Sequence, residues 1–316
     1  MILRSYTQNS PLLVLTYPVV ITSIILLGQQ ELWLKAQYAP LPWISAPFLN
    51  FGFIAVIFFN ASLANLIYNR SELYHSPTYL TGLIYAVFVS ITCVQTGNFY
   101  LLLAQMCSLI STYFAFSIFR QKKISHQLFL SALFMGVASL LDKFYLTFPL
   151  VLIFLSLWNR PFSVKDLIII LIGFLTPFLY WNSYNWLIEY SLNPNLSWTF
   201  LRGCNDLYSS QPSMPFNFCI TFSVILAVLS LPLKEERQSN KTVQSKQYLI
   251  LLFIISMAAM TIEYILNQRI KINEFVSFAP ILLLSHYWTH YRTSLLSPFV
   301  FYITMLIAII EFFHWF

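Results

Sequence analysis

The hydrophobic positions of this chain fall in long continuous runs, and the polar positions gather in short stretches between the runs. This pattern predicts helices that cross a bilayer, because about 20 apolar residues in a helix span the roughly 30 Å hydrocarbon core. We therefore expect an all-α fold, a polytopic transmembrane helix bundle with ten or eleven membrane segments in a single domain over 1–316. The predicted segments are 11–28, 44–68, 78–96, 98–119, 126–141, 144–158, 167–187, 216–233, 248–267, 275–288 and 295–314.

Three of these segments, at 126–141, 144–158 and 275–288, are shorter than the about 20 residues that a straight span needs. We expect them to be tilted, broken or shallow helices. Such helices are stable where protein or an aqueous cavity covers their backbone. The short segments therefore indicate where a polar site can lie within the membrane.

The connecting stretches predict the two membrane surfaces. Trp and Tyr mix with proline at 29–43, a composition typical of the headgroup layer, so this stretch is expected to be interfacial rather than spanning. The longest outer loop is expected at 188–215, and a basic cytoplasmic loop at 234–247. No connection is long enough to form a separate soluble domain.

The composition supports membrane embedding. Hydrophobic residues make up 58% of the 316 positions and charged residues only 9%, whereas soluble domains carry about 25% charged residues. This excludes a soluble enzyme, a nucleic-acid-binding domain and a disordered chain. Glycine is scarce, at seven residues, and no GxxxG motif occurs, so the 30 Phe and 19 Tyr are expected to fill the space between helices.

The basic residues predict the orientation. The net charge is +6, but the basic residues are scattered over short connections, as orientation signals are, so no nucleic acid partner is expected. With a cytoplasmic N-terminus and eleven crossings, twelve of the seventeen basic residues lie on the cytoplasmic side. The other five are Lys35, Lys143, Arg202, Arg269 and Lys271.

Charges on the outer side are candidates for chemistry, because ionised groups near the membrane core are costly and usually face an interior cavity. Glu31 follows the first segment and is either a carboxylate base that activates a hydroxyl group or an interfacial acid paired with Lys35. Arg269 and Lys271 precede a short segment and form either an anion site or a solvated loop.

Asp142 and Lys143 interrupt an apolar stretch and predict a hairpin between two short helices. In one interpretation Lys143 binds a phosphate group, and Asp142 holds Lys143 in place or acts as an acid or base. In the other, the pair forms a solvated turn whose charges extend out to water. No nucleotide-binding, hydrolase or zinc motif occurs, so neither a cofactor nor a metal is expected.

Several stretches carry a resemblance to known families: LIYNR at 66–70, FMGVASLLDK at 134–143, NRPF at 159–162 and LIGFLTPF at 171–178. The region 126–187 resembles a family of small multi-pass membrane proteins of unknown function found in Bacteroidota. More distantly, the whole layout is similar to the C superfamily of membrane glycosyltransferases (GT-C), which use a polyprenyl-phosphate sugar at the outer face of the cytoplasmic membrane.

The resemblance implies a bacterial inner-membrane location and a polyprenyl-phosphate-linked sugar as donor. It implies that Glu31 acts as the catalytic base or binds a metal, that Lys143 binds the donor phosphate, and that Arg269 or Lys271 supplies a second cation. The usual acidic pair is reduced here to Gln30-Glu31, and the first outer loop is short. The alternative is therefore a non-catalytic subunit that serves assembly or lipid binding in a larger membrane complex, with membrane lipids and other subunits as partners.

Overall fold

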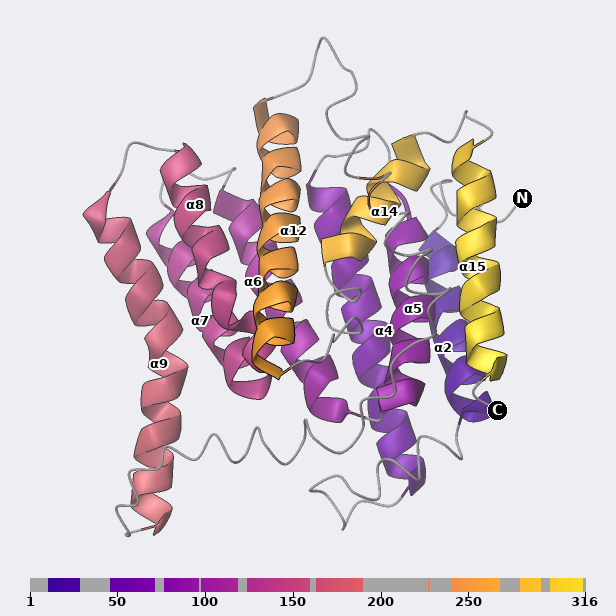
Figure 1. Cartoon of the computed structure of the whole chain (residues 1–316), viewed down its shortest axis with the longest axis horizontal. Coiled ribbons are helices and arrows are strands. Elements are labelled where there is room, and N and C mark those ends of the chain that lie inside the picture. Colours follow the sequence, from indigo (N-terminus) through magenta and orange to yellow (C-terminus); the bar gives the residue numbers. More distant parts are fainter. Residues whose placement is uncertain are drawn as a thin grey trace. The chain divides into compact units, whose positions relative to one another are not determined.

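Helix is the regular secondary structure throughout the part of the chain that can be described. The computed structural model describes residues 11–28, 46–71, 77–96, 98–118, 124–159, 163–189, 225, 227, 240–267, 279–290 and 296–314. Within these ranges there are ten α-helices and two short 3-10 helices (Figure 1), which confirms the predicted all-α class. The elements are η1 (Pro11–Leu15), α2 (Thr16–Leu27), α4 (Ala46–Arg70), α5 (Leu80–Thr96), α6 (Phe99–Ile118), α7 (Ser125–Leu141), η2 (Lys143–Thr147), α8 (Pro149–Asn159), α9 (Val164–Glu189), α12 (Asn240–Asn267), α14 (Ala279–His290) and α15 (Leu296–His314).

Within the described part of the chain, four helices are long and apolar enough to cross a membrane. They contain the apolar stretches Asn50–Arg70, Phe99–Ile118, Val164–Tyr184 and Thr242–Ala259. The predicted short segment 126–141 is confirmed as a short helix, since α7 has 17 residues and is flanked by described non-helical residues; the described parts of α8 and α14 have 11 and 12 residues. The predicted segments at 29–43 and 216–233 lie outside the described residues, apart from Ile225 and Ala227.

One predicted boundary is wrong. The basic loop expected at 234–247 ends early, because α12 begins at Asn240 and the last eight residues of that stretch are helical. Hydropathy marks only the apolar part of a helix, whereas the backbone hydrogen bonds of a helix continue into polar sequence. Ser245 and Lys246 are buried on this polar turn.

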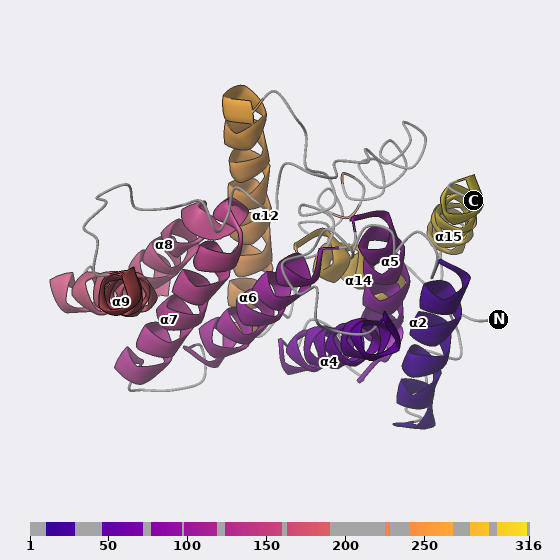
Figure 2. The ribbon, with the colours of Figure 1, turned by 90° about the horizontal axis from the view of Figure 1, so that it is seen from below.

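The chain divides into two compact units, and the first comprises 1–99 and 210–316. Its central helix is α5, which contacts α2, α4 and α14 (Figures 1 and 2). A Cβ at Gly82 would meet the ring of Tyr17, and a Cβ at Gly28 would meet Val94. The start of α2 thus lies beside the start of α5, and the end of α2 beside the end of α5, so the two helices run parallel.

Helix α4 runs antiparallel to α5. Near the end of α5, Phe53 packs edge-on against Phe99, with 5.3 Å between ring centroids. At the opposite end, the Asn69 amide donates to the Thr78 carbonyl oxygen at 3.0 Å. The end of α2 and the start of α4 therefore lie at the same end of α5, as expected for two successive crossings in opposite directions.

The second unit comprises 100–209 and contains the hairpin α7–η2–α8 together with α9. Among the described helices, α7 and α9 make the most extensive contact. A Cβ at Gly136 would lie 2.4 Å from the Phe174 carbonyl oxygen, and a Cβ at Gly173 would lie 2.8 Å from the Phe129 carbonyl oxygen. The two helices therefore run parallel with their backbones in close approach, which only glycine permits.

Helix α6 joins this packing through a pair of serines. The Ser111 hydroxyl donates to the Ser131 carbonyl oxygen at 2.7 Å, and the Ser131 hydroxyl donates to the Ser111 carbonyl oxygen at 2.9 Å. Small polar side chains of this kind allow close contact between helices and satisfy their own hydrogen bonds in a medium without water. The contact anchors the start of the α7 hairpin.

Candidate functional site: the α7–α8 hairpin and the α7–α9 groove

Asp142 lies at the tip of the α7–η2–α8 hairpin, where α7 ends. Its backbone is extended, with φ −147° and ψ 127°, and its N–H donates to the Ala138 carbonyl oxygen at 2.8 Å. Its carboxylate accepts a hydrogen bond from the Phe144 N–H at 3.0 Å and so caps η2. The residue is 2% exposed. The interpretation in which both charges extend out to water is therefore wrong for Asp142.

Lys143 is exposed, and it is the first residue of η2. The same turn thus buries the acid and presents the base outward. A buried carboxylate that accepts a backbone hydrogen bond holds the turn in one conformation. The Asp142 cap therefore fixes the backbone from which the exposed Lys143 side chain extends. A cation held in this way is suited to bind an anionic group.

A cluster of aromatic side chains from η2 and the residue after it lies buried beside the turn. The rings of Phe144, Tyr145 and Phe148 have centroids 5.3–5.5 Å apart, and all three side chains are buried. Aromatic rings at this spacing add packing energy beyond their buried area. The sequence analysis singled out only the charged pair. It missed this cluster, although the three aromatic residues follow Asp142 by two, three and six positions.

The other predicted site residues cannot be placed beside this turn. Glu31, Arg269 and Lys271 lie outside the described residues. Of the predicted set, the structure places Asp142 and Lys143, which are neighbours in the chain. Within the described ranges, no group of three His, Cys, Asp or Glu residues is arranged to hold a metal ion.

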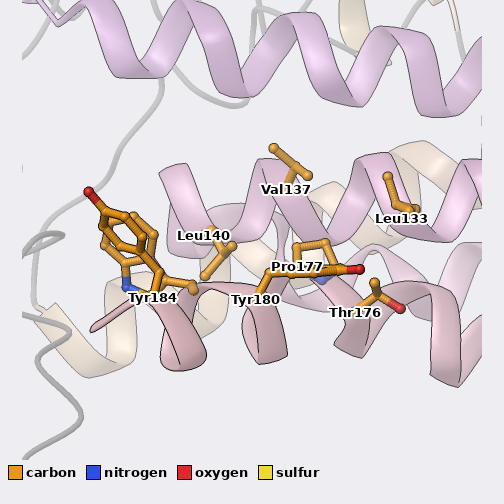
Figure 3. Close-up of a pocket in the computed structure, with 8 residues that line it drawn as sticks. Leu133, Val137, Leu140, Thr176, Pro177, Tyr180 and Tyr184 are labelled. Carbon is orange, nitrogen blue, oxygen red and sulfur yellow. The ribbon is translucent and has the colours of Figure 1, made fainter. Parts of the chain in front are cut away.

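A groove of about 510 Å³ opens between α7 and α9 beside this hairpin (Figure 3). Its α7 wall is formed by Leu133, Val137 and Leu140, which share one helix face at spacings of four and three residues. The α9 wall includes Pro177, Trp181 and Tyr184, which have the same spacing. These two stripes were visible in the sequence, but nothing there indicated that they face each other.

The groove is apolar along its length and aromatic at one end. Thr176 contributes a hydroxyl group, which donates to the Ile172 carbonyl oxygen of its own helix at 2.6 Å. Figure 3 shows Leu133 and Thr176 at one end, and Leu140 and Tyr184 at the other. Lys143 follows Leu140 by three residues, so their Cα atoms are at most about 11 Å apart. The backbone of the exposed cation therefore lies within about 11 Å of the Leu140 end of the groove.

No protein-family model, curated protein or solved structure matches this chain. The apolar helices, the hairpin tip and the groove are the features of the molecule that bear on its function.

Proposed function

We propose that this chain is an integral protein of the bacterial cytoplasmic membrane that transfers a sugar from a polyprenyl-phosphate donor at the outer face. The observation that carries the proposal is the exposed Lys143, held by the buried Asp142 cap at the tip of a hairpin of apolar helices. A fixed cation at the membrane surface complements a lipid phosphate, whose hydrocarbon chain remains in the bilayer.

The distribution of charge supports the orientation in which this tip is outside. Because α7 and α9 run parallel, their first residues lie at one end of the second unit and the hairpin tip lies at the other. In the sequence, basic residues occur just before α7 and around the connection from α8 to α9, and such clusters favour the cytoplasmic side. They are Arg120, Lys122, Lys123, Arg160 and Lys165.

In the proposed reaction, Glu31 takes the proton of the acceptor hydroxyl group. The hydroxyl oxygen then forms a bond to the anomeric carbon, and the bond between that carbon and the phosphate oxygen breaks. Negative charge develops on the leaving polyprenyl phosphate, where Lys143 and either Arg269 or Lys271 would stabilise it. Stabilisation of developing charge is commonly the largest catalytic contribution.

The test is sugar transfer by the full chain reconstituted in liposomes with a polyprenyl-phosphate sugar. Glu31→Gln and Lys143→Gln should each lower the rate at least about 100-fold, by analogy with the loss of one charge-stabilising group. Lys143→Arg should restore part of the rate. Thermal unfolding controls for misfolding. Unchanged transfer in both Gln variants would end the proposal.

The second candidate is a non-catalytic lipid-binding or assembly subunit of a membrane complex. It is favoured by the structural use of Asp142 as a cap and by α9, in which only 11% of the apolar window is buried. Stoichiometric co-purification with other membrane proteins, together with full function of a Glu31→Ala variant in cells, would favour this candidate over transfer.

A further inference from the structure

We infer that the α7–α9 groove holds a hydrocarbon chain of a bilayer phospholipid, with the headgroup phosphate of that lipid at Lys143. The inference goes beyond the proposed function, since it needs only that α7 and α9 lie in a bilayer. In the proposed reaction, the phosphate of the donor would displace the phospholipid headgroup from Lys143.

The groove has the chemistry of a chain site. Leu133, Val137 and Leu140 form one wall, and the hydroxyl group of Thr176 is satisfied within its own helix. A groove with apolar walls, between the short apolar helix α7 and the long apolar helix α9, does not favour polar ligands, because each polar group placed there would lose its hydrogen bonds. Hydrocarbon is the occupant that such walls accept.

The aromatic end of the groove marks the level of the headgroups. Tyr180 is 75% exposed and Tyr184 is 56% exposed, and both line the groove together with Trp181. Tyr and Trp concentrate at the membrane–water boundary, where the ring stays in hydrocarbon and the polar atom reaches water. This end therefore lies where the ester and phosphate groups of a lipid lie.

Charge complementarity selects a phosphate-bearing lipid as the occupant. Beyond the aromatic end, α7 is followed by the buried Asp142, whose carboxylate caps the turn, and then by the exposed cation Lys143. Apolar walls, an aromatic boundary and a cation follow one another in the order in which a phospholipid presents its chain, its esters and its phosphate. A second copy of this chain would have to place an apolar helix in the groove and an acid at Lys143. The exposed stretch of α9 offers the former, and the two acids of α9, Asp166 and Glu189, lie at the ends of the helix, so the experiment below also tests for a second copy.

The experiment uses the full chain purified into detergent from membranes that contain phosphatidylglycerol with a photoreactive diazirine in its acyl chain. After exchange to remove loosely bound lipid, the sample is irradiated and the cross-linked peptides are mapped. We expect cross-links on 133–140 and 176–184 of the wild-type chain. Cross-links confined to other helices, or recovery of polyprenyl phosphate in place of phospholipid, would overturn the inference.

Two variants and a control sharpen the test by native mass spectrometry of retained phosphatidylglycerol. Val137→Trp fills the groove and should lower retention at least tenfold, whereas Ile172→Trp, on the exposed face of α9, should leave retention unchanged. Lys143→Gln should weaken retention of phosphatidylglycerol and leave retention of uncharged diacylglycerol unchanged. Equal retention in wild type and Val137→Trp, or covalent dimers through the groove, would overturn the inference. The wild-type cross-linking decides the question if Val137→Trp fails to fold.

Discussion

Helices α5 and α9 are both apolar, yet they occupy opposite environments. In α5, every side chain from Leu80 to Val94 except Val87 is buried, and α2, α4 and α14 pack around it. In α9, only 11% of the apolar window is buried, and α7 covers it along one edge at Gly173. Hydrophobicity therefore does not distinguish the enclosed helix from the exposed one.

The polar residues do distinguish the two helices. Buried α5 carries Thr81, Ser90 and Thr92, whereas the exposed face in the middle of α9 carries large apolar side chains such as Leu175 and Leu179, and the exposed polar Asn182 and Ser183 lie near its end. In a water-soluble protein this distribution is reversed. The difference indicates that the medium around α9 is hydrocarbon and that polar groups are retained where other helices can satisfy them.

The largest expected effect tests the environment of α9 directly. Leu175→Asp should raise the apparent free energy of membrane insertion of α9 by about 3–4 kcal/mol, because Asp is strongly disfavoured at the centre of a spanning helix. The fraction of α9 inserted, measured with engineered glycosylation sites on both sides of the helix, reports this change. Leu175→Phe is the control and should insert normally. Normal insertion of the Asp variant would mean that this face contacts water.

Gly136→Ala tests the contact that attaches α9. The new Cβ would lie 2.4 Å from the Phe174 carbonyl oxygen, a backbone atom that cannot rotate away. We expect a loss of about 3 kcal/mol in the free energy of unfolding, at the upper end of the range for overpacking. Gly52→Ala is the matched control, because its Cβ would meet Phe99 at an ordinary 3.7 Å. Thermal unfolding in detergent compares the two variants, and equal melting temperatures would contradict the parallel α7–α9 packing.

A smaller effect is expected at the hairpin tip. Asp142→Ala removes the acceptor for the Phe144 N–H and should cost about 1 kcal/mol of stability, as loss of a helix cap does. Asp142→Asn keeps an oxygen in the same place and should be close to wild type in stability. Chemical denaturation measures both changes. A large loss with Asn would show that the charge of Asp142, rather than its role as a cap, holds the turn.

The smallest effect concerns the polar contacts between helices. The hydroxyl oxygens of Ser111 and Ser131 also lie 2.9 Å apart, and a double-mutant cycle of Ser111→Ala and Ser131→Ala should give a coupling energy of about 0.6 kcal/mol for this contact, the average for hydrogen bonds between membrane helices. A parallel cycle of Tyr68→Phe and Thr289→Val tests the 2.6 Å contact between α4 and α14 in the first unit. Coupling near zero in both cycles would mean that these hydroxyl–hydroxyl contacts do not stabilise the helix packing.

The helices were predictable from the sequence to within a few residues, apart from the start of α12. The close packing of α7 and α9 was not. The chain has no GxxxG motif, but Ala132 and Gly136 are two small residues with the same four-residue spacing, and both lie at the contact. A small residue becomes informative only when the partner helix is known, and Gly173 lies 37 positions beyond Gly136 in the chain.

Sequence alone determined that this chain forms apolar helices with charges at their ends. The free energy of solvation of each segment depends on the residues of that segment, so no knowledge of tertiary contacts is needed. The burial of Asp142 beside an exposed Lys143, and the face-to-face position of two apolar stripes, were decided by tertiary structure. These features depend on which backbone approaches which. In a medium as apolar as the side chains themselves, hydrophobicity does not determine which helices pack together. Shape complementarity and hydrogen bonding determine it instead.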